Sequence, residues 1–368
     1  MVGWQWLLMF SIAGVAPDCR WPGQNRLALP IYVCPRTGQQ HGFCAILPTM
    51  SHTHTTTSAA DQGQVAVFFP VEGRAHWLQA LQEAWPDAHF VVWPEVAPHA
   101  TQAVAWSPTQ EFVDHHPQLQ YLFNMGAGVD AILRLQLPQQ LQIVRIEDGG
   151  MAAQMAEYVC HAVLRHVREF DHYASSQAKQ LWQPRRAQAK ADFPIGIMGL
   201  GVLGTHVAQC LRGFGFNVNG WSQSAKQIDG ISSFAGQKAL AEFLQRSRIL
   251  VCLLPLTPAT QGILNRHHLS QLQRGAYLIN VARGGHLVEA DLLELLEQGH
   301  MAGAMLDVTQ QEPLPAEHPF WSHPCITITP HISAQTQAVQ AAAQIADNVR
   351  RIAAGQTPSG LVDRGGGY

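Results

Sequence analysis

The stretch IGIMGLGVLG at residues 195–204 indicates the fold of the second half of this chain. Its first four residues form an apolar run typical of a buried strand, and a turn with the spacing GxGxxG follows at once. In such a turn the first glycine permits a sharp bend, and the second lets a pyrophosphate approach the N-terminus of the next helix. The third lets that helix pack closely on the strand. We therefore predict a dinucleotide site at Gly199, Gly201 and Gly204.

Strand candidates alternate with helix candidates on both sides of this motif, a pattern that indicates parallel sheets covered on both faces. Strands are predicted at 65–69, 89–93, 104–106, 119–123, 193–198, 217–221, 249–253, 277–280, 302–306 and 326–328. Helices are predicted at 77–85, 151–170, 202–213, 237–246, 287–298 and 336–353. The last of these helices is expected to pack back on the first domain. We predict an α/β protein in which a Rossmann-type doubly wound cofactor domain, 154–333, is inserted in a flavodoxin-like substrate domain, 62–153 plus 334–360.

Composition limits the function classes. The chain has 368 residues, 47% hydrophobic and 13% charged, with a formal net charge of -3. This balance gives no general attraction to nucleic acid or to an anionic membrane. The seven cysteines are scattered without a CxxC pair, as expected for reduced thiols in the cytoplasm, and we predict no metal site. His115, His116, His267, His268 and His323 are interpreted as surface residues.

Two segments lie outside the regular alternation. Residues 1–61 are predicted to be an N-terminal extension, disordered or added by a start codon placed too far upstream, with Met50 as the alternative start. Residues 174–192 are polar and are predicted to form a surface connection or a dimer arm.

Two further signals follow predicted strands downstream of the glycine turn. Arg283 lies in NVARGG, residues 280–285, and its planar guanidinium stays charged and binds a carboxylate bidentately. His331 lies in TPH, residues 329–331, and suits proton transfer near neutral pH. Glu312 is the candidate carboxylate to orient this imidazole. With the dinucleotide site, these residues predict hydride transfer to or from a 2-hydroxy acid.

The motif GAGVD at residues 126–130 follows the predicted strand 119–123. Glycines at a strand end let backbone N–H groups approach an anion closely, although a plain strand–helix turn has the same pattern. With Arg283 present we interpret this motif as a substrate contact.

The loop after strand 217–221 bears on the choice of cofactor. Enzymes that use NAD place an acidic residue about 20 residues beyond the glycine turn to bind the ribose 2′-hydroxyl. This chain has Ser222, Gln223 and Lys226 there, and its first acid is Asp229. Without a carboxylate to repel a 2′-phosphate, we expect NADPH to be preferred, with NADH possible.

The order of these motifs resembles the D-isomer-specific 2-hydroxyacid dehydrogenases over roughly residues 62 to 357, and most closely their bacterial glyoxylate/hydroxypyruvate reductase A subgroup. The resemblance implies that Arg283 binds the substrate carboxylate, that His331 donates the proton and that Glu312 is its partner. It also implies backbone contacts from Ala127 and Gly128 to the substrate. It implies cofactor contacts at Val202, Leu203, Leu254, Pro255, Val281 and Asp307, and a homodimer.

The resemblance further implies reduction of glyoxylate to glycolate and of hydroxypyruvate to D-glycerate. The subgroup commonly has arginine where Gln223 stands, which weakens the NADPH expectation. The substrate pocket is expected to include Trp93 or Trp106. Two alternatives stay open: another D-2-hydroxyacid dehydrogenase, or a non-catalytic nicotinamide-sensing co-regulator.

Overall fold

The computed structural model describes residues 63–69 and 73–366, so the predicted extension at 1–61 lies outside the described residues. The first half of the described chain builds a parallel sheet of five strands in the order β2-β1-β3-β4-β5. This is the flavodoxin-like order 2-1-3-4-5. Its strands and helices are β1 (Gln64–Phe68), α1 (Arg74–Ala84), β2 (His89–Val92), β3 (Gln102–Ala105), α2 (Gln110–Asp114), β4 (Tyr121–Asn124), α3 (Asp130–Leu133) and β5 (Gln142–Val144).

The second half builds a parallel sheet of seven strands in the order β12-β11-β10-β9-β6-β7-β8. Read from β8, this is the Rossmann order 3-2-1-4-5-6 with β12 added at the edge. Its elements are α4 (Met151–Val167), α5 (Phe170–Ala178), η2 (Lys190–Asp192), β6 (Ile195–Met198), α6 (Val202–Gly213), β7 (Val218–Ser222), β8 (Ser232–Ala235), α7 (Gly236–Gln245), β9 (Ile249–Cys252), α8 (Arg266–Leu269), β10 (Ala276–Asn280), η3 (Gly284–His286), α9 (Glu289–Glu297), β11 (Met301–Leu306), η4 (Pro319–Trp321) and β12 (Ile326–Ile328). The predicted α/β fold with a doubly wound sheet is confirmed.

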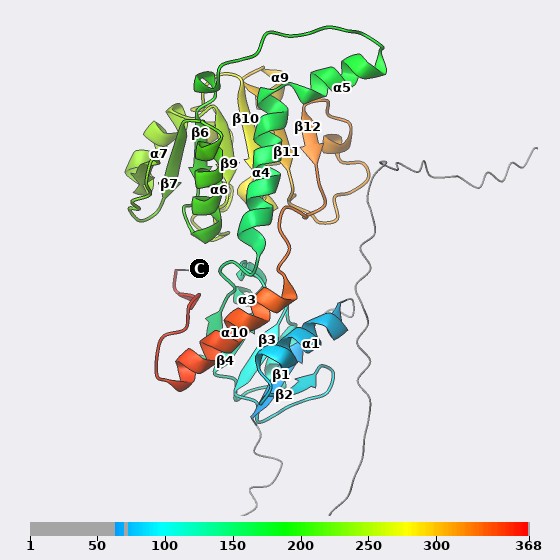
Figure 1. The fold of residues 1–368 in the computed structure, drawn as a ribbon. Coiled ribbons are helices and arrows are strands. Elements are labelled where there is room, and N and C mark those ends of the chain that lie inside the picture. The colour runs from blue at the N-terminus through cyan, green and yellow to red at the C-terminus, as the bar shows by residue number, and fades with distance from the viewer. Residues whose placement is uncertain (1–62, 70–72, 367–368) are drawn as a thin grey trace, which may run out of the picture. The chain divides into compact units, whose positions relative to one another are not determined.

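The central strands of each sheet are buried on both faces, which explains why β1, β6, β9 and β10 are nearly continuous apolar runs. On the seven-stranded sheet, α4 and α6 share one core, and α7, α8 and α9 share the other (Figure 1). On the five-stranded sheet, α2 and α3 cover one face. The opposite face is covered by α1 together with α10 (Ala338–Ala353).

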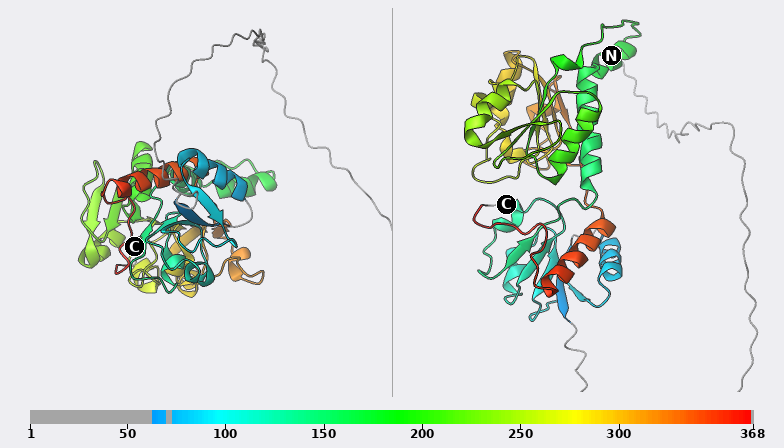
Figure 2. Two further views of the ribbon diagram at one scale, coloured as in Figure 1. Left: turned by 90° about the horizontal axis from the view of Figure 1, so that it is seen from below. Right: turned by 60° about the vertical axis from the view of Figure 1, so that its left-hand side comes forward.

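Helix α10 comes from the end of the chain but packs beside α1, as Figures 1 and 2 show in red and blue. The apolar side chains of α10 lie between the helix and the strands β1, β3 and β4, and Ile345 is 1% exposed. The chain therefore leaves the five-stranded sheet after β5, builds the seven-stranded sheet and returns. The predicted domain limits, 62–153 with 334–360 and 154–333, remain predictions, and the limit at 153/154 falls within the first turn of α4.

The predicted surface connection or dimer arm at 174–192 contains the end of α5 and the short helix η2, and its role remains a prediction. The structure corrects one expectation. His116 is not a surface residue but 0% exposed. Its Nε2 accepts from the N–H of Ala97 at 3.2 Å, and its Nδ1 lies 2.7 Å from the Phe112 carbonyl oxygen. Burial lowers its pKa, so the ring packs in a neutral form.

Among the described residues, no helix has both the length and the apolar content that crossing a membrane requires.

Candidate active site

The glycine turn after β6 has the geometry that its sequence predicts. Gly199 has φ +105°, and a Cβ there would lie 2.7 Å from the Leu253 carbonyl oxygen. A Cβ on Gly204 would lie 1.8 Å from the Gly199 carbonyl oxygen, so α6 and the turn need both glycines to pack. At Gly201 a Cβ would meet nothing within 4 Å. The protein therefore leaves open space at the N-terminus of α6, where unpaired backbone N–H groups favour an anion such as a pyrophosphate.

Two buried asparagines organise the loops that follow β4 and β10. Asn124 closes β4, and its Nδ2 donates to the carbonyl oxygens of Gly126 and Gly128 at 2.8 and 2.9 Å. Asn280 closes β10, and its Nδ2 donates to the Arg283 carbonyl oxygen at 3.1 Å, while its Oδ1 accepts from the Ala282 N–H at 3.2 Å. Each side chain bonds backbone groups of the loop that follows its strand, and so fixes that loop.

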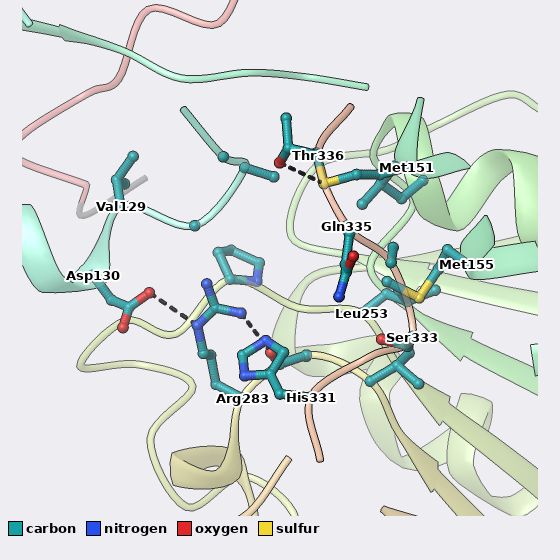
Figure 3. A pocket seen from close by; sticks show the side chains of 18 of the residues that line it. Val129, Asp130, Met151, Met155, Leu253, Arg283, His331, Ser333, Gln335 and Thr336 are labelled. Carbon is teal, nitrogen blue, oxygen red and sulfur yellow. Dashed lines mark hydrogen bonds and ion pairs between the residues drawn. The ribbon is translucent and has the colours of Figure 1, made fainter. Parts of the chain in front are cut away.

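Arg283 extends from the β10 loop into the space beside the β4 loop (Figure 3). Its Nε donates to Asp130 Oδ1 at 3.1 Å and its Nη1 donates to the Ala282 carbonyl oxygen at 2.7 Å. A Cβ on Gly128 would lie 1.7 Å from Nη2, so only glycine leaves room for the guanidinium here. The side chain is 30% exposed, which keeps part of the cation accessible to a ligand.

His331 and Glu312 form the predicted pair. The Nδ1 of His331 lies 2.8 Å from Glu312 Oε2. The other carboxylate oxygen of Glu312 accepts from the Thr309 N–H at 3.1 Å, which fixes the carboxylate in turn. A carboxylate on Nδ1 selects the tautomer with the proton on that nitrogen, and it stabilises the imidazolium that carries a second proton on Nε2. The pair can therefore hold a transferable proton at Nε2.

A buried carboxylate holds the backbone around His331. Asp307 is 1% exposed, and it accepts from the Thr329 hydroxyl at 2.6 Å and from the Ile332 and Ser333 N–H groups at 2.8 Å each. The N–H of His331 donates to the carbonyl oxygen of Asp307 at 2.9 Å. His331 has φ +55°, a left-handed conformation that non-glycine residues adopt only when their surroundings enforce it. These bonds supply that enforcement.

The same network reaches α4. The Tyr158 and Thr329 hydroxyl oxygens lie 2.5 Å apart. Burial raises the pKa of Tyr158, so its hydroxyl stays protonated. Because Thr329 gives its only hydrogen to Asp307, Tyr158 is the donor to Thr329. A chain of three hydrogen bonds thus connects α4 with the loop that carries His331.

Part of the predicted substrate and cofactor set lines one cavity of about 430 Å³. Its walls include Ala127, Gly128, Arg283 and His331 from the substrate set, and Leu203, Leu254, Pro255 and Val281 from the cofactor set. The cofactor residues that do not line it include Gly199, Gly201, Val202, Gly204, Ser222, Gln223 and Lys226. Glu312 and Asp307 do not line it and act on it through His331. Of the two candidate tryptophans, Trp106 lines the cavity, whereas Trp93 packs against Phe112. A cavity of this size suits a small polar ligand beside part of a cofactor.

The loop expected to select the cofactor continues from β7. The Ser222 hydroxyl is buried and donates to the Ser224 carbonyl oxygen at 2.8 Å, while Gln223 and Lys226 are exposed. Asp229 lies in the same loop, and its Oδ2 pairs with Arg212 Nη1 at 3.1 Å. The end of β7 therefore presents no carboxylate, and Arg212 adds a cation to this part of the surface.

Sequence reasoning did not identify several cavity residues. Asp130 is the last residue of the motif GAGVD, and its pairing with Arg283 joins positions 153 residues apart. Trp77, on α1, also lines the cavity, and the sequence predicted only that it belongs to a helix. The methionines Met125, Met151 and Met155 complete an apolar wall. The motif GAGVD was a signal for Asp130, whereas nothing local distinguishes the tryptophan and the methionines from core residues.

Comparisons with known proteins identify relatives of this chain. The model of the NAD binding domain of the D-isomer specific 2-hydroxyacid dehydrogenases matches residues 160–333. A glyoxylate/hydroxypyruvate reductase A from Serratia proteamaculans is 48% identical over 306 residues, which cover 81% of this chain and 98% of that protein. A D-isomer specific 2-hydroxyacid dehydrogenase from Xanthobacter autotrophicus, solved with NADPH and MES, superposes with a TM-score of 0.80 at 37% identity, over 83% of this chain and all of that chain. An NADPH-dependent glyoxylate/hydroxypyruvate reductase from Sinorhizobium meliloti, solved with NADP and sulfate, gives 0.78 at 33% identity over the same shares.

Proposed function

This chain belongs to the D-isomer specific 2-hydroxyacid dehydrogenase family and is an NAD(P)-dependent oxidoreductase, and we propose that it reduces glyoxylate to glycolate and hydroxypyruvate to D-glycerate with NADPH. One observation carries the proposal: the guanidinium of Arg283 and the imidazole of His331 line the same cavity as the residues beside the glycine turn. A carboxylate anchor, a proton donor and a dinucleotide turn are the parts that reduction of a 2-oxo acid requires.

Arg283 binds the substrate in this mechanism. Its guanidinium holds the carboxylate and polarises the adjacent carbonyl oxygen, and its charge is permanent. The backbone N–H groups of Ala127 and Gly128 donate to the same anion, since the Asn124 side chain holds their loop against β4. Trp106 and Trp77 close the apolar side of the cavity, which favours a small acid.

His331 delivers the proton. Its Nδ1 is held by Glu312, so Nε2 is the nitrogen left to donate to the carbonyl oxygen of the substrate. The hydride comes from the reduced nicotinamide of NADPH when it is bound. Reduction consumes this proton, and the imidazole returns to its charged form by taking another from solvent.

The preference for NADPH is supported by the absence of a carboxylate at the end of β7 in the described chain and by the cations Lys226 and Arg212 near that loop. The Gly199–Gly204 turn, with Val202 and Leu203 at the start of α6, would hold the pyrophosphate. The Xanthobacter and Sinorhizobium relatives were solved with NADPH and NADP. Gln223 offers only a neutral side chain to the 2′-phosphate, so the preference over NADH is expected to be modest.

We also propose that the working form is a homodimer. The segment that follows α4 exposes apolar side chains to an unusual degree, with Phe170 at 52%, Leu181 at 46% and Trp182 at 98%. Large exposed apolar side chains on one segment are typical of a surface that another chain covers. Sedimentation analysis should give twice the mass of the chain, and Trp182→Glu should shift it toward the monomer.

The test of the proposed reaction is the loss of reduced-nicotinamide absorbance on adding glyoxylate or hydroxypyruvate, with NADPH and NADH compared side by side. The proposal predicts rapid loss with NADPH and slower loss with NADH. Arg283→Ala should abolish reduction and leave cofactor binding nearly intact. Equal use of both cofactors would refute the preference. Cofactor binding without oxidation by any small 2-oxo acid would refute the reductase and favour the sensor alternative.

A further inference from the structure

The guanidinium of Arg283 is clamped before any substrate arrives. Asp130 Oδ1 accepts from Nε at 3.1 Å, and the Ala282 carbonyl oxygen accepts from Nη1 at 2.7 Å. Gly128 lies against Nη2, where a Cβ would be 1.7 Å away. An exposed arginine side chain otherwise samples many rotamers, and holding one of them costs free energy at the moment of binding. A side chain already fixed at three points avoids most of that cost.

The acceptor on Nε determines which part of the guanidinium faces the cavity. Arginine has five N–H donors, and the structure gives acceptors for one on Nε and one on Nη1. Within residues 63–69 and 73–366, Nη2 has no protein acceptor. Because Gly128 lies directly beside Nη2, the backbone of Gly128 and this nitrogen border the same region of the cavity. Both are proposed above to contact the substrate carboxylate.

Asp130 is itself held in place. It is the first residue of α3, in the loop after β4 that Asn124 fixes through Gly126 and Gly128. Its side chain is 23% exposed, and its Oδ1 is the acceptor that Nε uses. Arg283 comes from the loop after β10, so one ion pair joins the loops of two different sheets at the substrate cavity.

We propose that Asp130 is the positioning residue for Arg283: by accepting the Nε–H, it holds the guanidinium so that Nη2 meets the carboxylate of a small 2-oxo acid. The inference rests on the proposed function, because it assigns Asp130 to the same substrate site. The opposite reading is that Asp130 competes with the substrate for the cation. The two readings predict opposite changes in affinity when the carboxylate is removed.

The experiment measures binding of oxalate to the full-length protein saturated with NADPH. Quenching of tryptophan fluorescence is a suitable signal, because Trp77 and Trp106 line the cavity. Asp130→Ala should weaken oxalate binding, and raise KM for glyoxylate, by about 10-fold or more, the loss expected when a hydrogen bond to a charged group is removed. The kcat should change less than KM. Asp130→Asn keeps an oxygen acceptor for Nε–H, and should stay within about threefold of the wild type.

Glu242→Ala is the matched control, since it removes a carboxylate from an exposed pair with Arg246 at 2.7 Å on α7, far from the cavity lining. It should leave oxalate binding unchanged. The affinity for NADPH and the Tm should be the same in all variants, which separates positioning from loss of structure. Rescue by asparagine is the result that a purely structural role would not produce.

Two results would overturn the proposal. If Asp130→Ala binds oxalate as tightly as the wild type or more tightly, Asp130 is a bystander or a competitor. If Asp130→Asn is as impaired as the alanine variant, the hydrogen bond to Nε is not what matters. A wild-type protein that binds oxalate but reduces neither proposed substrate would refute the proposed reaction. In that case the oxalate titrations of the Asp130 variants would still decide whether Asp130 positions Arg283.

Discussion

Substituting Gly128 by alanine should disable the substrate site through a single methyl group. The backbone of Gly128 is outside the left-handed region, so alanine is allowed by conformation and the effect comes from space alone. The new Cβ would lie 1.7 Å from Arg283 Nη2 and 2.8 Å from Cζ, whereas ordinary contact begins at 3.4 Å. The guanidinium must therefore retreat by about 1.7 Å, the difference between these two Nη2 distances.

A displacement of this size is large for a substrate-binding group. Misplacement by about 1 Å can cost about 100-fold in rate, so kcat/KM of Gly128→Ala for glyoxylate should fall by at least about that factor. NADPH affinity, measured by fluorescence titration, should be unchanged, because the glycine turn after β6 is untouched. The control is Gly213→Ala at the end of α6, where a Cβ would meet nothing within 4 Å. A Gly128→Ala enzyme with nearly normal kcat/KM would refute the placement of Arg283 against this loop.

Three further predictions concern two carboxylates that act on His331 and, away from the cavity, His166 of α4, whose ring stacks on Tyr277. Asp307→Asn places an amide opposite the Ser333 N–H, so the loop that carries His331 should loosen. The kcat should fall about 10-fold and the free energy of unfolding by about 1–3 kcal/mol. An unchanged kcat would contradict the role of the Asp307 hydrogen bonds. Glu312→Gln removes the negative charge that lies 2.8 Å from His331 Nδ1, and should lower kcat by about 100-fold with an unchanged affinity for NADPH. A normal kcat would show that catalysis does not depend on this pair. Burial lowers the pKa of His166 from 6.5 to about 4, so the folded state binds fewer protons than the unfolded state between these values. The free energy of unfolding should therefore fall as pH drops through this window, by at most about 3 kcal/mol, and it should fall less in His166→Phe. Equal shifts in Tm between about pH 7.5 and about pH 5 in both proteins would contradict this.

The sequence predicted the fold because its signals are local. An apolar strand, a glycine turn and a helix occupy adjacent residues, and the strand order follows from repeated units of this kind. Arg283 and His331 were found for the same reason, since each follows a strand whose C-terminal end lies at the ligand-binding edge. The structure brings both to one cavity, and their catalytic roles remain predictions. The dimer and the cytoplasmic location also remain predictions.

What the sequence could not give depends on packing between distant segments. His115 and His116 are adjacent and chemically identical, yet only His116 faces the core. Both follow the last residue of α2, Asp114, so no helical periodicity assigns either ring to a buried or an exposed face. Asp130 and Arg283 pair across two sheets, and no periodicity within either segment predicts that contact. Trp106 lines the cavity because Gly126, whose Cβ would lie 2.3 Å from the indole ring, leaves room for it.

The central claim is hydride transfer from NADPH to the 2-oxo carbon, with the proton supplied by the protein. The most direct measurement is reduction of hydroxypyruvate with NADPH deuterated at both C4 positions, followed by mass and chiral analysis of the product. The product should be D-glycerate with one deuterium at C2, and it should form only while Arg283 and His331 are intact. Two kinds of product would contradict this mechanism: glycerate of the L configuration, or a product without deuterium. Labelled D-glycerate formed at the wild-type rate by both the Arg283→Ala and the His331→Ala protein would also contradict it.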